Sequence, residues 1–149
     1  MQLMRRSLLK AGLIVSGMIA LPRVLFAAWP DKAFSSKKRE EALMELYGST
    51  DVSTSDAVVL TAPDIAENGA VVPVSVSSSL DKVESIAIVV DNNPSPLTAT
   101  FELGEGAIAE VSTRIKMGKT SNVLAVVKAD GKLYGVEKEV KVTIGGCGG

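Results

Sequence analysis

The sequence predicts an all-β fold: an immunoglobulin-like antiparallel β-sandwich of about seven strands, preceded by a short N-terminal helix. From residue 58 onward, hydrophobic residues recur at every second position in several segments, which is the period of a strand that buries one face. Short runs of Gly, Asn, Asp, Ser and Pro separate these segments, and such runs are typical of turns. The chain has 149 residues, 46% of them hydrophobic, so it is long enough to bury a core as one domain.

Residues 1–28 have the features of an export signal. Arg5 and Arg6 precede an apolar stretch, and small residues at its end offer a cleavage site. Because Leu9-Lys10 follows the paired arginines, we favour a twin-arginine signal, which exports folded proteins to the periplasm, over a general secretory signal with two chance arginines. The apolar stretch is short for a membrane span, so an uncleaved anchor is the less favoured alternative.

The net charge changes once the signal is set aside. The whole chain has 16 basic and 17 acidic residues and a formal charge of −1. Residues 1–28 hold four of the bases and none of the acids, so the remaining chain carries −5. An anionic body of this kind is poorly suited to bind phosphate backbones or anionic lipid. We therefore expect no nucleic-acid partner, and no membrane association after signal cleavage.

Residues 29–56 are predicted to form a linker and one helix. The helix should run from Lys37 to Tyr47, with Ser35 or Ser36 as its N-cap and Gly48 as its C-terminal stop. A helix with one apolar face usually packs on its own domain, and a partner-binding helix is the less favoured alternative. The apolar positions of this face are Ala42, Leu43, Leu46 and Tyr47.

Residues 57–144 are predicted to form the sandwich domain. Pro73 has no amide hydrogen to donate, which predicts that its strand lies at the edge of a sheet. An exposed edge is a place where a second subunit can dock. The predicted strands cover residues 58–62, 71–76, 83–90, 97–103, 108–115, 123–128 and 132–144.

The residue counts exclude several kinds of active site. With no His, the chain has no Ser-His-Asp triad, no Cys-His pair, no His-ligated haem and no ordinary zinc site. With one Cys, it has no internal disulfide and no Cys-x-x-Cys redox pair. We expect no metal, no cofactor and no catalytic residue of its own.

Three polar motifs have plain structural explanations. The Gly-Glu-Gly run at 104–106 lies between two predicted strands rather than before a helix, so a turn is favoured over a nucleotide-binding loop. The Asp-Asn-Asn run at 91–93 lacks the spaced acids of a calcium loop and is also predicted to be a turn. Arg114 and Lys116 place two cations on one strand face, which is usually a solvated face; contact with a docking partner or an anionic ligand is the alternative.

The last five residues are Gly145, Gly146, Cys147, Gly148 and Gly149. One alternative is a frayed terminus with a stray thiol. We favour a flexible carrier arm, because an exposed free thiol in an exported protein risks oxidation and because glycine gives a thin, mobile backbone that can enter a narrow channel.

Cys147 has nothing in its sequence neighbourhood that would activate it. There is no His, and the nearest cation in sequence is Lys141. The terminal carboxylate two residues away favours a raised thiol pKa. An unactivated thiol on a flexible arm predicts a covalent attachment point. Other proteins would then catalyse the reactions at this thiol. Two alternatives stay open: a thiol-transfer protein that performs its own chemistry, and an interaction module that forms disulfide-linked dimers through Cys147.

Taken together, these motifs resemble the SoxY family, the sulfur-carrying subunits of periplasmic thiosulfate oxidation. The most specific part is Gly-Gly-Cys-Gly-Gly directly after a Val-Lys-Val-Thr-Ile strand. The resemblance also covers the signal and residues 42–48, 68–74, 93–97 and 114–118.

The resemblance implies a set of partners. SoxY proteins are immunoglobulin-like and form a tight complex with SoxZ, which would be exported together with the signal-bearing chain. Cys147 matches the carrier cysteine. The cytochrome SoxXA would couple thiosulfate to it, the hydrolase SoxB would release sulfate and leave a persulfide, and SoxCD or another sulfur acceptor would take the remaining sulfur.

Overall fold

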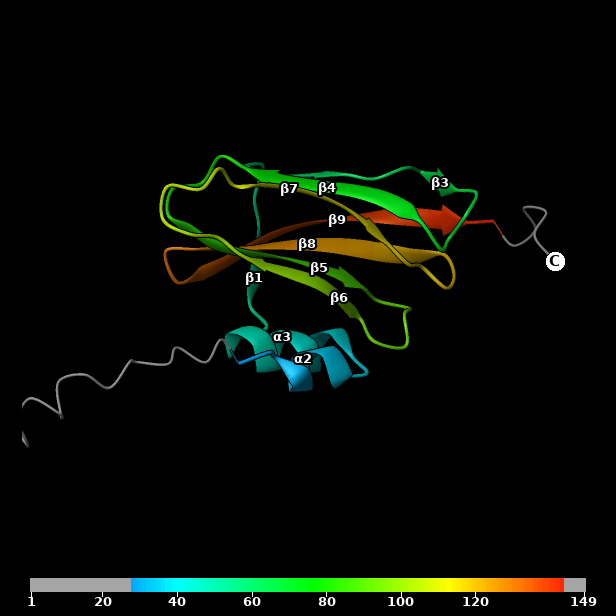
Figure 1. Ribbon diagram of the computed structural model, residues 1–149, viewed down its shortest axis with the longest axis horizontal. Helices are drawn as coiled ribbons and strands as arrows, with labels where there is room; N and C mark the ends of the chain where they lie inside the picture. Colours follow the sequence, from blue (N-terminus) through cyan, green and yellow to red (C-terminus); the bar gives the residue numbers. More distant parts are fainter. Residues whose placement is uncertain (1–27, 144–149) are drawn as a thin grey trace, which may run out of the picture.

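The computed structural model describes residues 28–143, which form three layers (Figure 1). Two β-sheets face each other, and a pair of short helices covers the outer face of the larger sheet. The predicted immunoglobulin-like β-sandwich with an N-terminal helix is confirmed. The helices are α2 (Asp31–Ser35) and α3 (Arg39–Tyr47), and the strands are β1 (Val52–Thr54), β2 (Val58–Thr61), β3 (Ile65–Ala66), β4 (Val72–Ser78), β5 (Val83–Val90), β6 (Leu97–Glu102), β7 (Glu110–Ile115), β8 (Ser121–Ala129) and β9 (Lys132–Val142).

The larger sheet has the strand order β1-β9-β8-β5-β6, and the smaller sheet has the order β2-β4-β7. The seven strands predicted from the sequence all form, and they pair antiparallel. Two further strands were not predicted: β1 and β3 pair parallel with β9, β1 beside its first half and β3 beside its end. β1 therefore lies within the segment predicted as linker.

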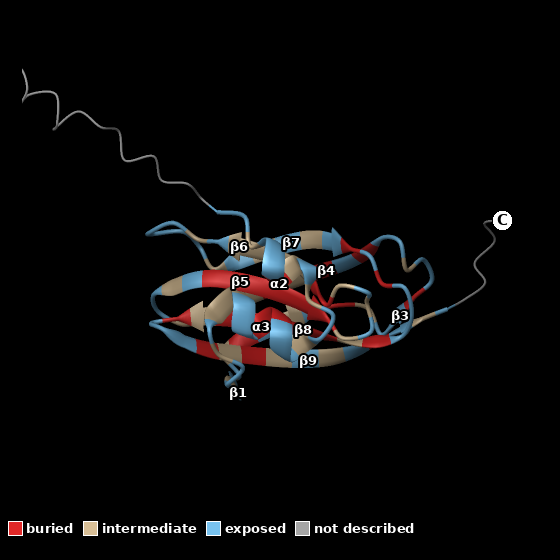
Figure 2. Ribbon diagram, turned by 90° about the horizontal axis from the view of Figure 1, so that it is seen from below, coloured by how far each residue is buried: buried red, intermediate tan, exposed pale blue. Residues whose placement is uncertain are grey.

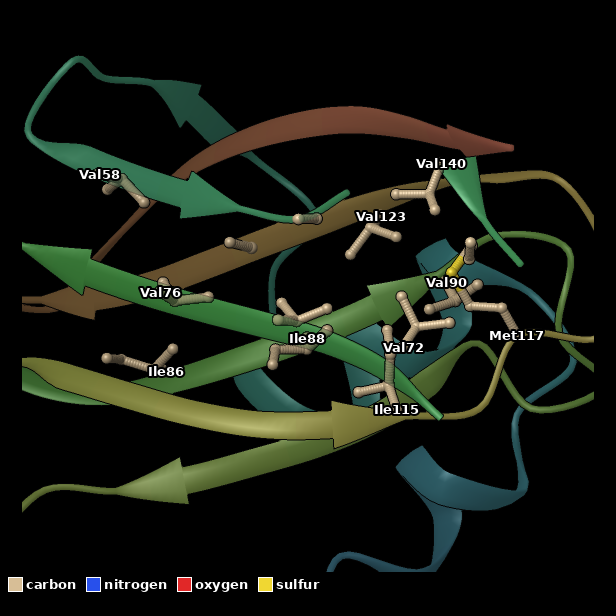
Figure 3. Close-up of a cluster of buried hydrophobic side chains, with 14 of the residues drawn as sticks. Val58, Val72, Val76, Ile86, Ile88, Val90, Ile115, Met117, Val123 and Val140 are labelled. Atoms are coloured by element: carbon tan, nitrogen blue, oxygen red, sulfur yellow. The ribbon is translucent and has the colours of Figure 1, made fainter. Parts of the chain in front are cut away.

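The sandwich core lies between the two sheets and is built almost entirely of aliphatic side chains (Figure 3). Alternate residues of β5, such as Ile86 and Ile88, point into this core and are fully buried. The residues between them, Ala87 and Val89, are equally buried but belong to a second cluster beneath the helices. β5 is buried on both faces, which explains its unbroken hydrophobic run in the sequence.

The helix layer packs on the outer face of the larger sheet, over β5 and β8 (Figure 2). Ala42 and Leu43 are buried there, so the predicted apolar face of the helix packs on its own domain. Gly48 ends α3 as predicted: it adopts a left-handed φ of 70°, and its amide donates to the Met44 carbonyl at 2.8 Å.

The predicted N-cap of this helix is wrong. Lys38 occupies the N-cap position of α3 and makes no side-chain cap bond. Ser35 and Ser36 instead end the additional helix α2, and the Ser36 hydroxyl donates to the Lys32 carbonyl at 2.8 Å. The serine hydroxyl satisfies the carbonyl of a preceding turn rather than an amide of the following one.

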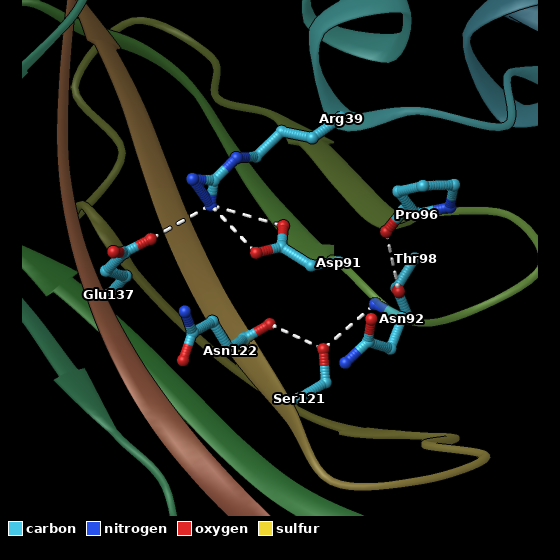
Figure 4. Close-up of polar contacts among 8 residues, drawn as sticks. All are labelled: Arg39, Asp91, Asn92, Pro96, Thr98, Ser121, Asn122 and Glu137. Atoms are coloured by element: carbon cyan, nitrogen blue, oxygen red, sulfur yellow. Dashed lines mark hydrogen bonds and ion pairs between the residues drawn. The ribbon is translucent and has the colours of Figure 1, made fainter.

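Arg39, at the start of α3, ties the helix layer to the larger sheet (Figure 4). Its guanidinium lies 2.9 Å from the Glu137 carboxylate on β9 and 3.2 Å from the Asp91 carboxylate, which follows β5. Burial raises the pKa of Asp91, and the charge of Arg39 opposes that rise. The cation therefore offsets part of the cost of placing a partly buried carboxylate between two layers.

The phenol of Tyr47, at the end of α3, is predicted to make the free energy of unfolding decrease at alkaline pH. Burial is the main cause that raises its pKa to about 12, and its hydroxyl accepts a hydrogen bond from the Ser85 hydroxyl. Since the native state holds the phenol proton more tightly than the unfolded chain, the stabilisation is complete below pH 10 and is lost as pH rises toward about 12. Urea unfolding across this range should show a steeper loss in the parent protein than in Tyr47→Phe. An equal slope in the two proteins would contradict the prediction; Tyr134→Phe, which keeps Tyr47, is the control.

Pro73 does not mark an edge strand, contrary to the sequence prediction. Its strand, β4, lies in the middle of the smaller sheet. The Ser78 amide donates to the Ala109 carbonyl, just before β7, and the Ser79 amide donates to the Ala57 carbonyl, just before β2. Because successive amides of a strand point to opposite sides, the nitrogen of Pro73 faces the β2 side. β2 pairs with β4 only as far as Ser75. The proline therefore lies just beyond the end of the neighbouring strand, where no amide is needed.

The two loop motifs predicted to be turns are turns. In the 104–106 run, the Ala107 amide donates to the Gly104 carbonyl at 3.0 Å between β6 and β7. In the 91–93 run, the Asn93 amide donates to the Val90 carbonyl at 3.2 Å between β5 and β6. Neither loop precedes a helix.

Candidate functional site

The residues that the sequence singles out most strongly lie outside the described part of the chain. They are the arm residues Gly145, Gly146, Cys147, Gly148 and Gly149, and the signal residues Arg5 and Arg6. The last described residue is Thr143, directly after β9. The structure therefore shows the part of the body that immediately precedes the arm in the sequence.

The end of β9 is fixed to two other segments. The Lys141 amide donates to the Asp64 carbonyl at 3.0 Å, and the Thr143 amide donates to the Ala66 carbonyl at 3.1 Å. From the other side, the Val142 amide donates to the Thr120 hydroxyl at 3.0 Å. The backbone up to Thr143 is thus held by β3 and by the β7–β8 loop.

A charged contact adds to this attachment. The ammonium group of Lys138 lies 2.8 Å from the Asp64 carboxylate and donates to the Ala62 carbonyl at 2.6 Å. The hydrogen bond from Lys138 holds the pKa of Asp64 below its ordinary value. Because the Asp64 side chain is exposed, the contact orients the segment before β3 more than it stabilises the fold.

Gly69 lets the β7–β8 loop approach the end of β9 closely. A Cβ at this position would lie 2.3 Å from the Met117 carbonyl oxygen and 2.9 Å from a methyl group of Val142. The Gly69 carbonyl also accepts the Met117 amide at 2.7 Å. Any side chain at residue 69 would push apart the segments that hold the base of the arm.

The two cations predicted as docking or anion contacts lie near this base, Arg114 on β7 and Lys116 directly after it. Arg114 is exposed on β7, opposite Pro73 on the outer surface of the smaller sheet. Lys116 is exposed just after β7, in the loop whose Thr120 holds β9. Sequence reasoning missed Lys119 in the same loop; the Lys-Met-Gly-Lys-Thr run directly after a strand is the signal that could have revealed it.

Residues 28–143 contain no group of three or more His, Cys, Asp and Glu side chains placed to hold a metal ion. None of the helices in this range has the length and hydrophobicity to cross a lipid bilayer.

Comparison with known proteins places the chain in a family. The family model described as "Sulfur oxidation protein SoxY" matches residues 43–147, which is well over half of the chain. The chain belongs to the SoxY family. The match begins in helix α3 and ends at Cys147, so it spans both sheets and reaches the arm.

A solved structure agrees with this membership. The sulfur carrier protein SoxY from Chlorobium limicola f thiosulfatophilum is 44% identical to the chain, with a TM-score of 0.65. The alignment covers 72% of this chain and 97% of the Chlorobium SoxY chain. No curated protein sequence matches.

Proposed function

We propose that this SoxY-family protein is a covalent sulfur carrier in thiosulfate oxidation, and that Cys147 on the C-terminal arm is the attachment site. The observation that carries the proposal is the family match that runs through Cys147, the single thiol of the chain. The body supports it by holding the backbone up to Thr143 from two sides. The carrier is the substrate of other enzymes and does no catalysis itself.

The proposed chemistry requires three kinds of partner. Loading forms a disulfide-type bond between the Cys147 sulfur and the terminal sulfur of thiosulfate; the thiol loses its proton, and two electrons pass to an oxidant, the role that the family resemblance gives to the cytochrome SoxXA. Hydrolysis by SoxB then breaks the bond between the outer sulfur and the sulfonate group, so that water yields sulfate and Cys147 keeps a persulfide. Where SoxCD is present, it oxidises the remaining sulfane sulfur and passes the electrons to an electron acceptor; where SoxCD is absent, the sulfur is transferred to another sulfur acceptor.

Export and assembly complete the proposal. The chain is exported to the periplasm by its twin-arginine signal, Arg5-Arg6, already folded and bound to SoxZ. Export in the folded state suits a protein whose sandwich is closed by contacts between distant segments, such as β3 and β9. In the Sox system, SoxZ is the stable partner, and the enzymes bind transiently.

Mass spectrometry of the intact protein tests the proposal. The mature protein is purified from cells respiring thiosulfate and compared with protein from cells grown without it. We expect thiosulfonate and persulfide masses that map to the peptide containing Cys147 and disappear on treatment with a reductant. Finding only the free thiol under both conditions would overturn the carrier function. A mass of twice the chain, reversible by reductant, would instead favour the disulfide-linked module.

A further inference from the structure

We propose that the exposed residues around the end of β9 form the docking surface for the enzymes that act on Cys147, and that these enzymes present an acidic rim to it. We call this surface the collar; it consists of Ile65, Val71, Lys116, Lys119 and Lys141. The inference rests on the proposed carrier function and names the part of the body that the enzymes touch.

The first argument is reach. Cys147 lies four residues beyond Thr143, and four fully extended residues span at most about 14 Å. Thr143 is held by its hydrogen bond to Ala66, so this span begins at a fixed point. An enzyme that takes Cys147 into a recessed active site must therefore bring the mouth of that site against the surface that surrounds Thr143.

The second argument is position, because the collar residues surround the point from which the arm departs. Ile65 pairs with Lys141 in the β3–β9 ladder. Lys119 precedes Thr120, whose hydroxyl accepts the Val142 amide. The residue after Lys116 donates its amide to Gly69, and Val71 closes the turn that contains this glycine.

The third argument is charge. The body carries −5, yet the three lysines of the collar are exposed, and among residues 28–143 none has a carboxylate within 4.0 Å. Asp64, the acid that precedes β3, is occupied by Lys138 at 2.8 Å. At the opposite end of the sandwich, Lys128 lies 2.9 Å from Glu84 and Lys82 lies 3.9 Å from Asp130. An acidic rim would be repelled by most of the body and attracted to the collar, which orients the enzyme over the arm.

The collar also offers apolar contact. Ile65 is 56% exposed and Val71 is 49% exposed, although both are large hydrophobic residues next to well-packed strands. Apolar side chains inside a charged border are typical of transient interfaces. Enzymes that share one carrier would all use this surface in turn, since each must reach the same short arm.

The test varies the carrier concentration. A periplasmic extract from the native host, deleted for its own copy of this chain, is supplied with the purified complex of this chain and SoxZ, and the initial rate of thiosulfate-dependent electron transfer is measured. For Lys116→Glu/Lys119→Glu we expect the apparent KM for the carrier to rise about tenfold with little change in the maximal rate, as for the loss of two modest charge contacts. The difference should shrink at high ionic strength. Lys116→Gln/Lys119→Gln should fall between this variant and the parent.

The matched control is Lys82→Glu/Lys132→Glu, which makes the same change of charge at the opposite end of the sandwich. An equal rise in KM in the control would overturn the proposal, because the effect would then come from net charge alone. A lower maximal rate at unchanged KM would overturn it in favour of lysines that contact the anionic sulfur adduct. Failure of the parent protein to restore any turnover would instead overturn the carrier function itself. Thermal unfolding and alkylation of Cys147 by iodoacetamide should be equal in all variants.

Discussion

Replacing Cys147 with serine is expected to abolish thiosulfate-dependent turnover while leaving the fold unchanged. Serine has nearly the same size, but its oxygen cannot form the sulfur–sulfur bond that loading requires. The described body, residues 28–143, contains no cysteine, so the substitution changes none of its side chains. The measurement is the add-back assay in periplasmic extract, together with circular dichroism and thermal unfolding of the variant.

A relocated thiol separates the presence of a cysteine from its place on the arm. Ser79→Cys in the Cys147→Ser background puts one thiol on an exposed residue directly after β4, at the end of that strand farthest from residue 72. We expect no rescue, because the body around residue 79 cannot enter a narrow active site. Full turnover by the Cys147→Ser protein would contradict the carrier function, and rescue by Ser79→Cys would contradict the role of the arm.

The same variants distinguish the two alternative functions. A thiol-transfer protein that performs its own chemistry needs an activated thiol, so a titration that finds a strongly depressed Cys147 pKa would favour it. A disulfide-linked module would lose its dimers in Cys147→Ser but keep supporting respiration. A carrier loses turnover completely in Cys147→Ser.

The seven longer strands can be predicted from local sequence patterns. The two short strands that were not predicted, β1 and β3, cannot. β7 alternates exposed Ser112 and Arg114 with the more buried Thr113 and Ile115, and this pattern predicts a strand without knowledge of its neighbours. β1 and β3 have three and two residues, and they exist because β9 offers its free edge to them in parallel. A strand of that length has no period to detect.

The error at Pro73 has a related cause. A proline predicts only that one amide is missing from the ladder; it does not say whether the neighbouring strand is absent or merely shorter. Here β2 pairs with Ser75 but does not extend to residue 73. The length of a neighbouring strand is decided only when the sheet assembles. The proline in the sequence therefore cannot predict it.

The candidate site divides in the same way. Cys147 and its glycines are predictable from their own sequence, because a single thiol between glycine pairs is a local signal. The base of the arm is not, since Val142 is held by Thr120, 22 residues away, and Thr143 also approaches Ala66, 77 residues away. Contacts over such separations are decided by sheet topology.

Gly69→Ala is expected to destabilise the protein by about 1–3 kcal/mol, the usual cost of forcing an extra methyl group into a packed site. The new Cβ would lie 2.3 Å from the Met117 carbonyl oxygen, and a backbone atom can move only with its loop. Alanine also restricts the unfolded chain, which stabilises by about 0.4–1 kcal/mol, so the clash should prevail. Urea unfolding measures the net effect.

The control is Gly118, which lies in the β7–β8 loop next to Met117. A Cβ at Gly118 meets no atom within 4 Å, and its φ is not positive, so Gly118→Ala should stay within about 0.5 kcal/mol of the parent. Hydrogen exchange at Val142 and Thr143 should quicken in Gly69→Ala alone, because their acceptors, Thr120 and Ala66, lie on the segments that the new methyl group separates. If the two alanine variants are equally stable and equally protected, the close approach at Gly69 does not hold the base of the arm. If hydrogen exchange quickens in Gly69→Ala alone, the rigidity of that base depends on the absence of a side chain at residue 69. The fixed point from which Cys147 reaches its enzymes then depends on the same glycine.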